Sequence, residues 1–109
     1  MVLVLVNVPR GAISVAISKA IVEERLAACV TAQPVTSTYW WEGKIQCDAE
    51  ETLTIKTTHS MLKELKKRVH ELHPYETPEF LVIPVDTVDS SRSYVDWVNK
   101  EVKPMVERE

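Results

Sequence analysis

Apolar and polar positions along the chain divide it into four predicted strands and three predicted helices. Four stretches rich in β-branched and aromatic residues predict strands over 2–8, 29–45, 49–58 and 79–85. Apolar residues four positions apart, Ile13, Ile17 and Ile21, predict an amphipathic helix within 10–28 that packs on a sheet.

A second helix should begin near Ser60 and end at Pro74, because proline cannot continue a helix. Its apolar stripe consists of Leu62, Leu65, Val69 and Leu72. A short terminal helix is expected over 91–102. Pro34 should bend the second strand or place it near a sheet edge, and a turn through 47–49 should join the second and third strands.

The order β-α-β-β-α-β plus a terminal helix predicts an α+β fold of the ferredoxin-like type. The length of 109 residues suits a single domain, 1–109. Such a fold is a four-stranded antiparallel sheet with its two main helices on one face. The other face of the sheet has no cover from the same chain.

Side chains alternate along a strand, so the hairpin should present two different faces. Tyr39, Trp41 and Ile45 are expected on one face. The reverse, uncovered face would carry Trp40, Glu42, Lys44, Thr52, Thr54 and Lys56. This face is either solvated, with one exposed tryptophan, or an interface. Three aromatic residues in the run "YWWEG", in a chain with 6% aromatic residues, favour self-association.

Composition and charge exclude several classes of partner. The net charge is −3 and no basic patch or tail is visible, which argues against nucleic acid or an anionic membrane. The apolar N-terminal run is too short to span a bilayer, and no targeting segment is recognised, so a cytoplasmic location is expected. Cys29 and Cys47 have no zinc-type spacing and are expected to be reduced thiols.

The stretch "HPYETPE" follows the second helix and has two interpretations. As architecture, His73 complements the last carbonyls of the helix and the prolines stop it. As a binding site, the imidazole of His73, the phenol of Tyr75 and the carboxylate of Glu76 meet at a rigid corner that suits a divalent metal or a small polar ligand. A helical projection places His73 at the edge of the buried face and His70 toward water.

No catalytic motif is present, so no enzymatic activity is expected. The chain lacks GxSxG, P-loop and GxGxxG patterns, and its only glycines are Gly11 and Gly43. A nucleophilic pair of Cys29 and His73 is the weaker alternative to a buried structural cysteine. Cys47, expected in an exposed turn, is a soft sulfur ligand that Cu(I) would prefer.

Five stretches, "VEERLAACV", "TSTYWWEGKI", "LTIKTT", "ELHPYETPE" and "YVDWV", together resemble the CutA divalent-cation tolerance proteins and cover most of the chain from 22 to 98. The resemblance implies a homotrimer whose hairpins pair across subunits, with Trp40 and Tyr39 in the interface. It also implies association with copper and other divalent cations, without an obligatory cofactor or an established reaction. The residues it implies in clefts between subunits are Trp41, Glu42, Lys56, His73, Tyr75 and Glu76.

Three functions remain open at this point. The first is a trimeric protein that binds divalent metal ions, with His73, Glu76 and the accessory thiol of Cys47 as ligands. The second is a PII-like signalling trimer that binds a small anionic metabolite, with Lys44 and Lys56 supplying positive charge. The third is a hydrolase or isomerase with His73 and Glu76 as acid and base, for which no substrate is specified.

Overall fold

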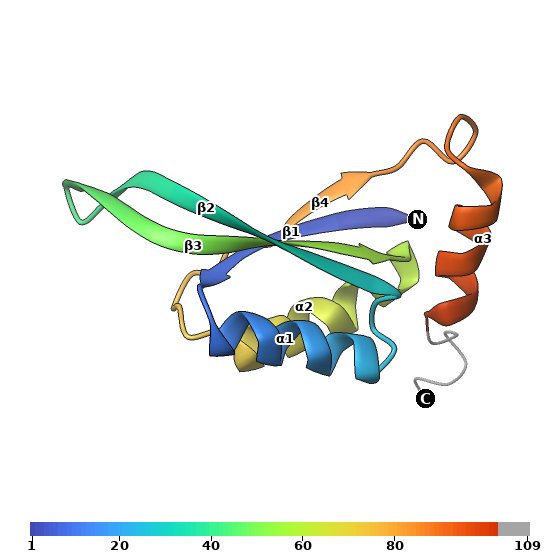
Figure 1. Ribbon diagram of the computed structural model, residues 1–109, viewed down its shortest axis with the longest axis horizontal. Coiled ribbons are helices and arrows are strands. Elements are labelled where there is room, and N and C mark those ends of the chain that lie inside the picture. The colour runs from blue at the N-terminus through green and yellow to red at the C-terminus, as the bar shows by residue number, and fades with distance from the viewer. Residues whose placement is uncertain (103–109) are drawn as a thin grey trace.

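The computed structural model describes residues 1–102 and consists of one antiparallel sheet with helices on one face and at one end (Figure 1). The strands are β1 (Val2–Pro9), β2 (Cys29–Trp41), β3 (Lys44–Thr57) and β4 (Leu81–Pro84). The helices are α1 (Ala12–Glu23), η1 (His59–Met61, a 3₁₀ turn), α2 (Leu62–Leu72) and α3 (Arg92–Glu101). The predicted element order is confirmed, and the sheet order β2-β3-β1-β4 is that of a ferredoxin-like fold.

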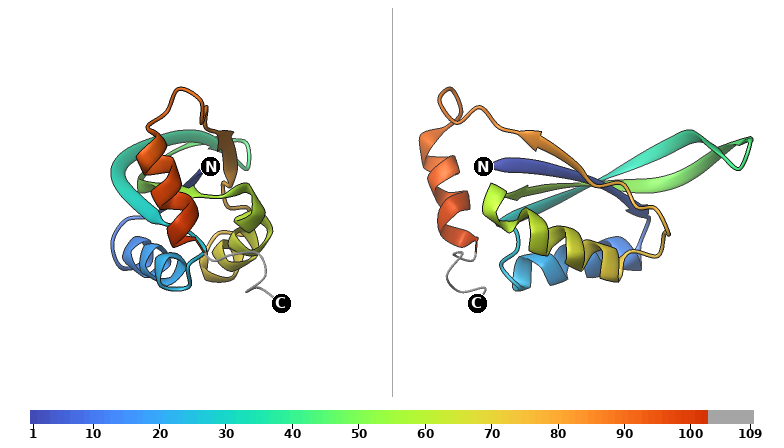
Figure 2. Two further views of the ribbon diagram at one scale, coloured as in Figure 1. Left: turned by 90° about the vertical axis from the view of Figure 1, so that its right-hand side faces the viewer. Right: turned by 180° about the vertical axis from the view of Figure 1, so that it is seen from behind.

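The core lies between the sheet and the paired helices α1 and α2, which run side by side beneath it (Figure 2). Alternate residues of β1 point into this core, because side chains of a strand alternate between its two faces. Ile17 and Ile21 of α1 and Leu65 and Val69 of α2 close it, each at most 1% exposed. The helical stripes expected from the sequence are therefore the buried ones.

The β2–β3 hairpin turns at Glu42 and Gly43, and the predicted turn through 47–49 is wrong. Both turn residues have positive φ angles, 50° and 76°. A two-residue loop of this kind is a type I′ turn, whose twist matches that of the flanking strands. Cys47 therefore lies within β3, opposite Thr38, instead of in a turn.

This turn also changes which hairpin residues share a face. It pairs Trp40 with Ile45 and Trp41 with Lys44, so the members of each pair lie on the same side. By this register Trp40 belongs to the side of the sheet that carries the helices, and Trp41 belongs to the opposite side with Lys56. The prediction that Trp40 lies on the uncovered face is wrong, because the turn comes earlier than expected and reverses the alternation.

Beyond the helices the hairpin overhangs the rest of the molecule (Figure 1). Trp40 and Ile45 are 73% and 63% exposed there, since nothing in residues 1–102 covers them. Pro34 lies in β2, an edge strand, as its missing N–H predicts.

The sheet face opposite α1 and α2 carries an apolar patch that we call the open sheet face. It consists of Leu3, Leu5, Leu81 and Ile83, which the register of β1 and β4 places side by side. Leu81 and Ile83 are 54% and 40% exposed. Within residues 1–102, no helix is long and apolar enough to cross a membrane.

Candidate functional site

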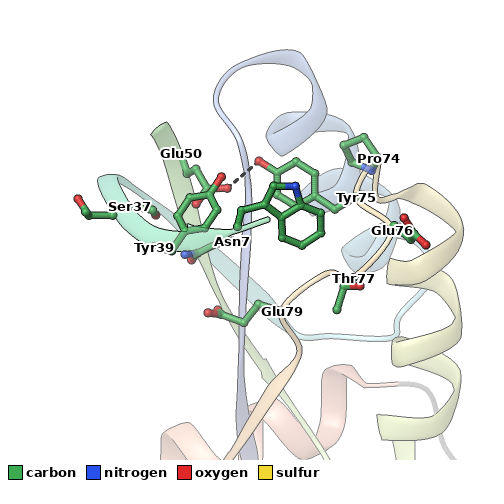
Figure 3. A pocket seen from close by; sticks show the side chains of 11 residues that line it. Asn7, Ser37, Tyr39, Glu50, Pro74, Tyr75, Glu76, Thr77 and Glu79 are labelled. Carbon is green, nitrogen blue, oxygen red and sulfur yellow. Dashed lines mark hydrogen bonds between the residues drawn. The ribbon is translucent and has the colours of Figure 1, made fainter. Parts of the chain in front are cut away.

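A cavity of about 760 Å³ lies where the hairpin meets the segment that follows α2 (Figure 3). We call it the acidic cleft, after the three glutamates among its lining residues. It is lined by Asn7, Ser37, Thr38, Tyr39, Trp41, Glu50, Pro74, Tyr75, Glu76, Thr77 and Glu79. Residues far apart in the sequence thus form its walls.

Glu50 is the most buried of these acids, with only 5% of its surface exposed. Its position follows from the register, because β3 pairs Glu50 with Val35 of β2 on one side and Pro9 of β1 on the other. The hydroxyl of Tyr75 donates a hydrogen bond to Oε2 of Glu50 over 2.7 Å. Burial, and then this bond, raise the pKa of Tyr75 above its ordinary value, so its phenol remains a hydrogen-bond donor well above neutral pH.

Glu79 adds a second carboxylate to the cleft, close enough to Glu50 to be affected by its negative charge. Burial, followed by the negative charge of Glu50, raises the pKa of Glu79 above its ordinary value. Glu76 lies on the other side of Tyr75 and points away from Glu50 (Figure 3).

Among residues 1–102, no basic side chain lines the acidic cleft. Arg10 lies close to it, but its guanidinium donates to the main-chain oxygens of Glu50 and Val35, at 3.1 and 2.9 Å. The salt bridges found within residues 1–102 involve none of the three cleft glutamates. Within the described part of the chain, the three cleft glutamates therefore have no salt-bridge partner.

Aromatic side chains form much of the remaining wall. Tyr39, Trp41 and Tyr75 line the cleft while staying 38%, 49% and 40% exposed. The hydroxyl of Tyr39 donates to the carboxylate of Asp48, and this bond is the main reason that the pKa of Tyr39 is raised. Acid groups beside exposed aromatic faces are a favourable environment for cations.

His73 is not among the residues that line the cleft and is 7% exposed. The main-chain N–H of Tyr75 donates to Nδ1 of His73 over 3.1 Å, so Nε2 carries the proton and donates to the carbonyl oxygen of Asn7 over 2.7 Å. The rings of His73 and Tyr75 are in contact, with centroids 4.7 Å apart. His73 therefore ties the segment after α2 to β1 and positions Tyr75.

The structure brings some of the residues expected from the sequence together and separates others. Trp41, Tyr75 and Glu76 line the acidic cleft, as does Tyr39, while Glu42 is in the hairpin turn. Lys56 is six positions along β3 from Glu50, about 20 Å in an extended strand. Its ammonium group donates to Oγ1 of Thr31 over 3.1 Å.

Two of the predicted metal ligands, His73 and Cys47, are poorly placed to bind a metal ion in the cleft. Both ring nitrogens of His73 are hydrogen-bonded, so a metal ion would have to displace one of these partners; His73 as a ligand stays a prediction. The same bonds leave it no free nitrogen to act as an acid or base with Glu76. Cys47 lies outside the cleft lining, and within residues 1–102 no three His, Cys, Asp or Glu side chains are grouped as a metal site.

Sequence reasoning did not identify Glu50 and Glu79 as site residues. The alternation of side chains along β3 could have indicated the position of Glu50. It places Glu50 on the same side of the sheet as Thr52 and Thr54, opposite the helices. The contact of Glu50 with Tyr75 joins residues 25 positions apart and depends on how the segment after α2 folds back.

The two thiols differ in accessibility, which predicts different reaction rates. Cys47 is exposed, whereas Cys29 is half-buried, with the ammonium of Lys56 4.0 Å from its sulfur. We expect a maleimide reagent to label Cys47 rapidly and Cys29 slowly in the native protein, as followed by mass spectrometry. Cys47→Ser should leave only the slow phase. Equal rapid labelling of both cysteines would contradict these positions.

The sequence matches the family model described as CutA1 divalent ion tolerance protein over residues 2–101. A divalent-cation tolerance protein CutA of Thermus thermophilus is 44% identical over 98 residues, which are 89% of this chain and 93% of that protein. The chloroplastic protein CutA 1 of Oryza sativa is 38% identical over 103 residues, 94% of this chain and 57% of that protein.

Solved structures agree with the sequence comparison. The PII-like protein CutA from Nostoc sp. PCC 7120, in apo form, superposes with a TM-score of 0.90 at 43% identity, covering 94% of this chain and 98% of that chain. CutA1 from Pyrococcus horikoshii superposes with a TM-score of 0.89 at 36% identity, covering 95% of this chain and all of that chain (100%).

Proposed function

Because the chain belongs to the CutA1 divalent ion tolerance family, we propose that it binds cations and that the acidic cleft is its binding site. The observation that carries this proposal is Glu50, a residue only 5% exposed that lines a cleft in which, among residues 1–102, no basic side chain takes part. A cation in the cleft would pair with this carboxylate, which has no salt-bridge partner among residues 1–102. The same acidic lining counts against the alternative of an anionic metabolite.

The chemistry of the donor groups suits divalent cations that prefer oxygen. Carboxylate oxygens of Glu50 and Glu79 are hard ligands, which favour Mg²⁺, Mn²⁺ or Ca²⁺ and accept Cu²⁺, whereas Cu⁺ prefers sulfur. Two carboxylates do not fill the coordination of any of these ions. The remaining ligands would be water molecules or groups from a second copy of the chain.

A second part of the proposal is that the chain acts as a homotrimer. The support is the open sheet face, where Leu81 and Ile83 are exposed beside Leu3 and Leu5. An exposed apolar patch of this kind, together with the aromatic residues of the overhanging hairpin, is typical of an interface. In such an assembly Tyr39 and Trp40 would be contact residues, and the acidic cleft would open between subunits.

Titration calorimetry with Mn²⁺ and, separately, Cu²⁺ at pH 7.5 tests the cation site. Glu50→Gln should weaken binding at least tenfold, about 1.4 kcal/mol, because it removes the buried charge while its amide oxygen still accepts from Tyr75. Glu23→Gln is the matched control: it makes the same change of net charge on the exposed surface of α1 and should bind as wild type. Equal affinities of wild type and Glu50→Gln for both ions would contradict the proposed site.

Acid should weaken the same binding. The pKa of Glu79 lies above the ordinary value of 4.5, so protons compete for this carboxylate at a higher pH than for an exposed glutamate. The stability of the unbound protein should change with pH in the opposite direction to its cation affinity. Protonation of Glu79 stabilises the folded state fully below the ordinary pKa of this carboxyl, and this stabilisation is lost as the pH rises through the raised pKa. Cation affinity should therefore fall as the pH drops through that range, and less so in Glu79→Gln.

The location of the protein in the cell stays a prediction. A cytoplasmic site is expected from the sequence, while relatives include a chloroplastic protein from Oryza sativa and a structure described as periplasmic from Archaeoglobus fulgidus.

A further inference from the structure

We propose that the acidic cleft binds an organic ammonium ion, with its charge between Glu50 and Glu79 and its hydrocarbon against Tyr39, Trp41 and Tyr75. The inference rests on the proposed cation site and names a ligand class for it. A linear diamine is the simplest ligand of this class, since it joins two cationic ends through an apolar chain.

The first argument is a carboxylate oxygen of Glu50 that has no hydrogen-bond partner within residues 1–102. One carboxylate oxygen accepts the hydroxyl of Tyr75, and within residues 1–102 no hydrogen bond is made to the other. That second oxygen is not completely buried. Among the side-chain nitrogen and oxygen atoms of the described residues, only the hydroxyl oxygen of Ser18 is both completely buried and without a hydrogen-bond partner. Since Glu50 lines the cavity, its free oxygen is accessible to a donor there. An ammonium group can donate directly to it.

The second argument is the aromatic wall. Three aromatic side chains, Tyr39, Trp41 and Tyr75, line the same cavity as the carboxylates. The faces of aromatic rings attract organic cations, and their apolar surfaces pack against methylene groups. A bare metal ion, which keeps a shell of water or oxygen ligands, would leave these surfaces without a partner.

The third argument is the number of ligands and the size of the cavity. Within residues 1–102 no three acidic, histidine or cysteine side chains are grouped to hold a metal ion. An ammonium group needs only two or three acceptors, which Glu50 and Glu79 supply. The volume of about 760 Å³ is also that of a site for a small organic molecule, and far exceeds the space that one ion requires.

Titration calorimetry with 1,4-diaminobutane at pH 7.5 tests the proposal, with 1,4-butanediol as the uncharged probe of similar length. The diamine should bind and the diol should bind at least tenfold more weakly. Glu50→Gln should weaken diamine binding tenfold or more, Glu79→Gln about threefold to tenfold, and Trp41→Leu about fivefold, since the aromatic contact is the weaker term. The surface control Glu23→Gln should bind as wild type.

A second copy of the chain is the competing source of positive charge, because Lys56 of a neighbouring subunit could occupy the same cleft. The variant Lys56→Met distinguishes a free ammonium ion from Lys56 of a neighbouring subunit as the occupant of the cleft. If the cleft takes a free ammonium ion, Lys56→Met binds the diamine as wild type does. Diamine binding that appears only in Lys56→Met would overturn the proposal, as would equal binding of diol and diamine, an unaffected Glu50→Gln variant, or no binding of the diamine to wild type.

The metal titrations and the diamine titrations together distinguish failure of the divalent-cation site from failure of the ammonium ligand. Loss of Mn²⁺ or Cu²⁺ affinity in Glu50→Gln, without diamine binding, would support the metal site and reject the ammonium ligand. Diamine binding that depends on Glu50, without measurable metal binding, would support the ammonium ligand and reject the metal.

Discussion

Replacing Leu81 by aspartate should dissociate the proposed homotrimer into folded monomers. Leu81 is 54% exposed in the single chain, so a monomer tolerates the charge, and its neighbour across the strand pair is Leu5 of the open sheet face. A carboxylate buried without a partner in an apolar contact costs several kcal/mol, and a trimer would contain three of them.

Analytical ultracentrifugation at micromolar concentration measures this effect. The wild type should sediment at about three times the chain mass of 12.4 kDa, and Leu81→Asp near that mass with an unchanged circular dichroism spectrum. Val15→Asp, on the exposed side of α1 at 66% exposure, should leave the trimer intact. A monomeric wild type, or a Leu81→Asp variant that remains trimeric, would show that the open sheet face is not the interface.

Shortening Ile17 to alanine should cause a large loss of stability. Ile17 is 1% exposed in the core between α1 and the sheet, so the change removes buried methyl groups and leaves a cavity. Such substitutions cost about 2–5 kcal/mol. Val15→Ala on the same helix is the control, and its cost should stay within about 0.5 kcal/mol because Val15 is exposed.

Urea unfolding at a fixed protein concentration measures both variants, since the proposed assembly would add a concentration-dependent contribution to the stability. Equal losses for Ile17→Ala and Val15→Ala would mean that the core is not where the structure places it.

The fold could be predicted from the sequence because its main signals are local. The spacing of Ile13, Ile17 and Ile21 identifies α1 and its buried side without any knowledge of the rest of the chain. The error in the hairpin had a local signal as well. Gly43 is one of only two glycines, and a residue–glycine pair at positive φ is the common signature of a type I′ turn.

The acidic cleft could be predicted only in part. The motif residues Tyr75 and Glu76 and the hairpin residue Trp41 were expected in a cleft, and the structure lines one cavity with all three. Glu50 could not be assigned to that cavity, because its position depends on the register of three strands and on the path of the segment after α2.

His73 illustrates the same limit. The helical projection places it at the edge of the buried face, and it is 7% exposed, although α2 ends at Leu72 and His73 follows the helix in an extended conformation. One of its hydrogen-bond partners, Asn7, is 66 positions away in the sequence. An exposed histidine suitable as a ligand and a buried histidine that connects two segments have the same local sequence, so only the tertiary structure distinguishes them.

Native mass spectrometry of untagged protein tests the central claim, that the acidic cleft is a cation site, most directly. Wild type and Glu50→Gln would be purified in parallel without chelators and compared by mass before and after acid denaturation. We predict that the native wild type carries a metal ion or an organic amine that acid releases, and that Glu50→Gln lacks it. An identical ligand content in both proteins, or retention of an anionic metabolite by the wild type, would contradict the claim.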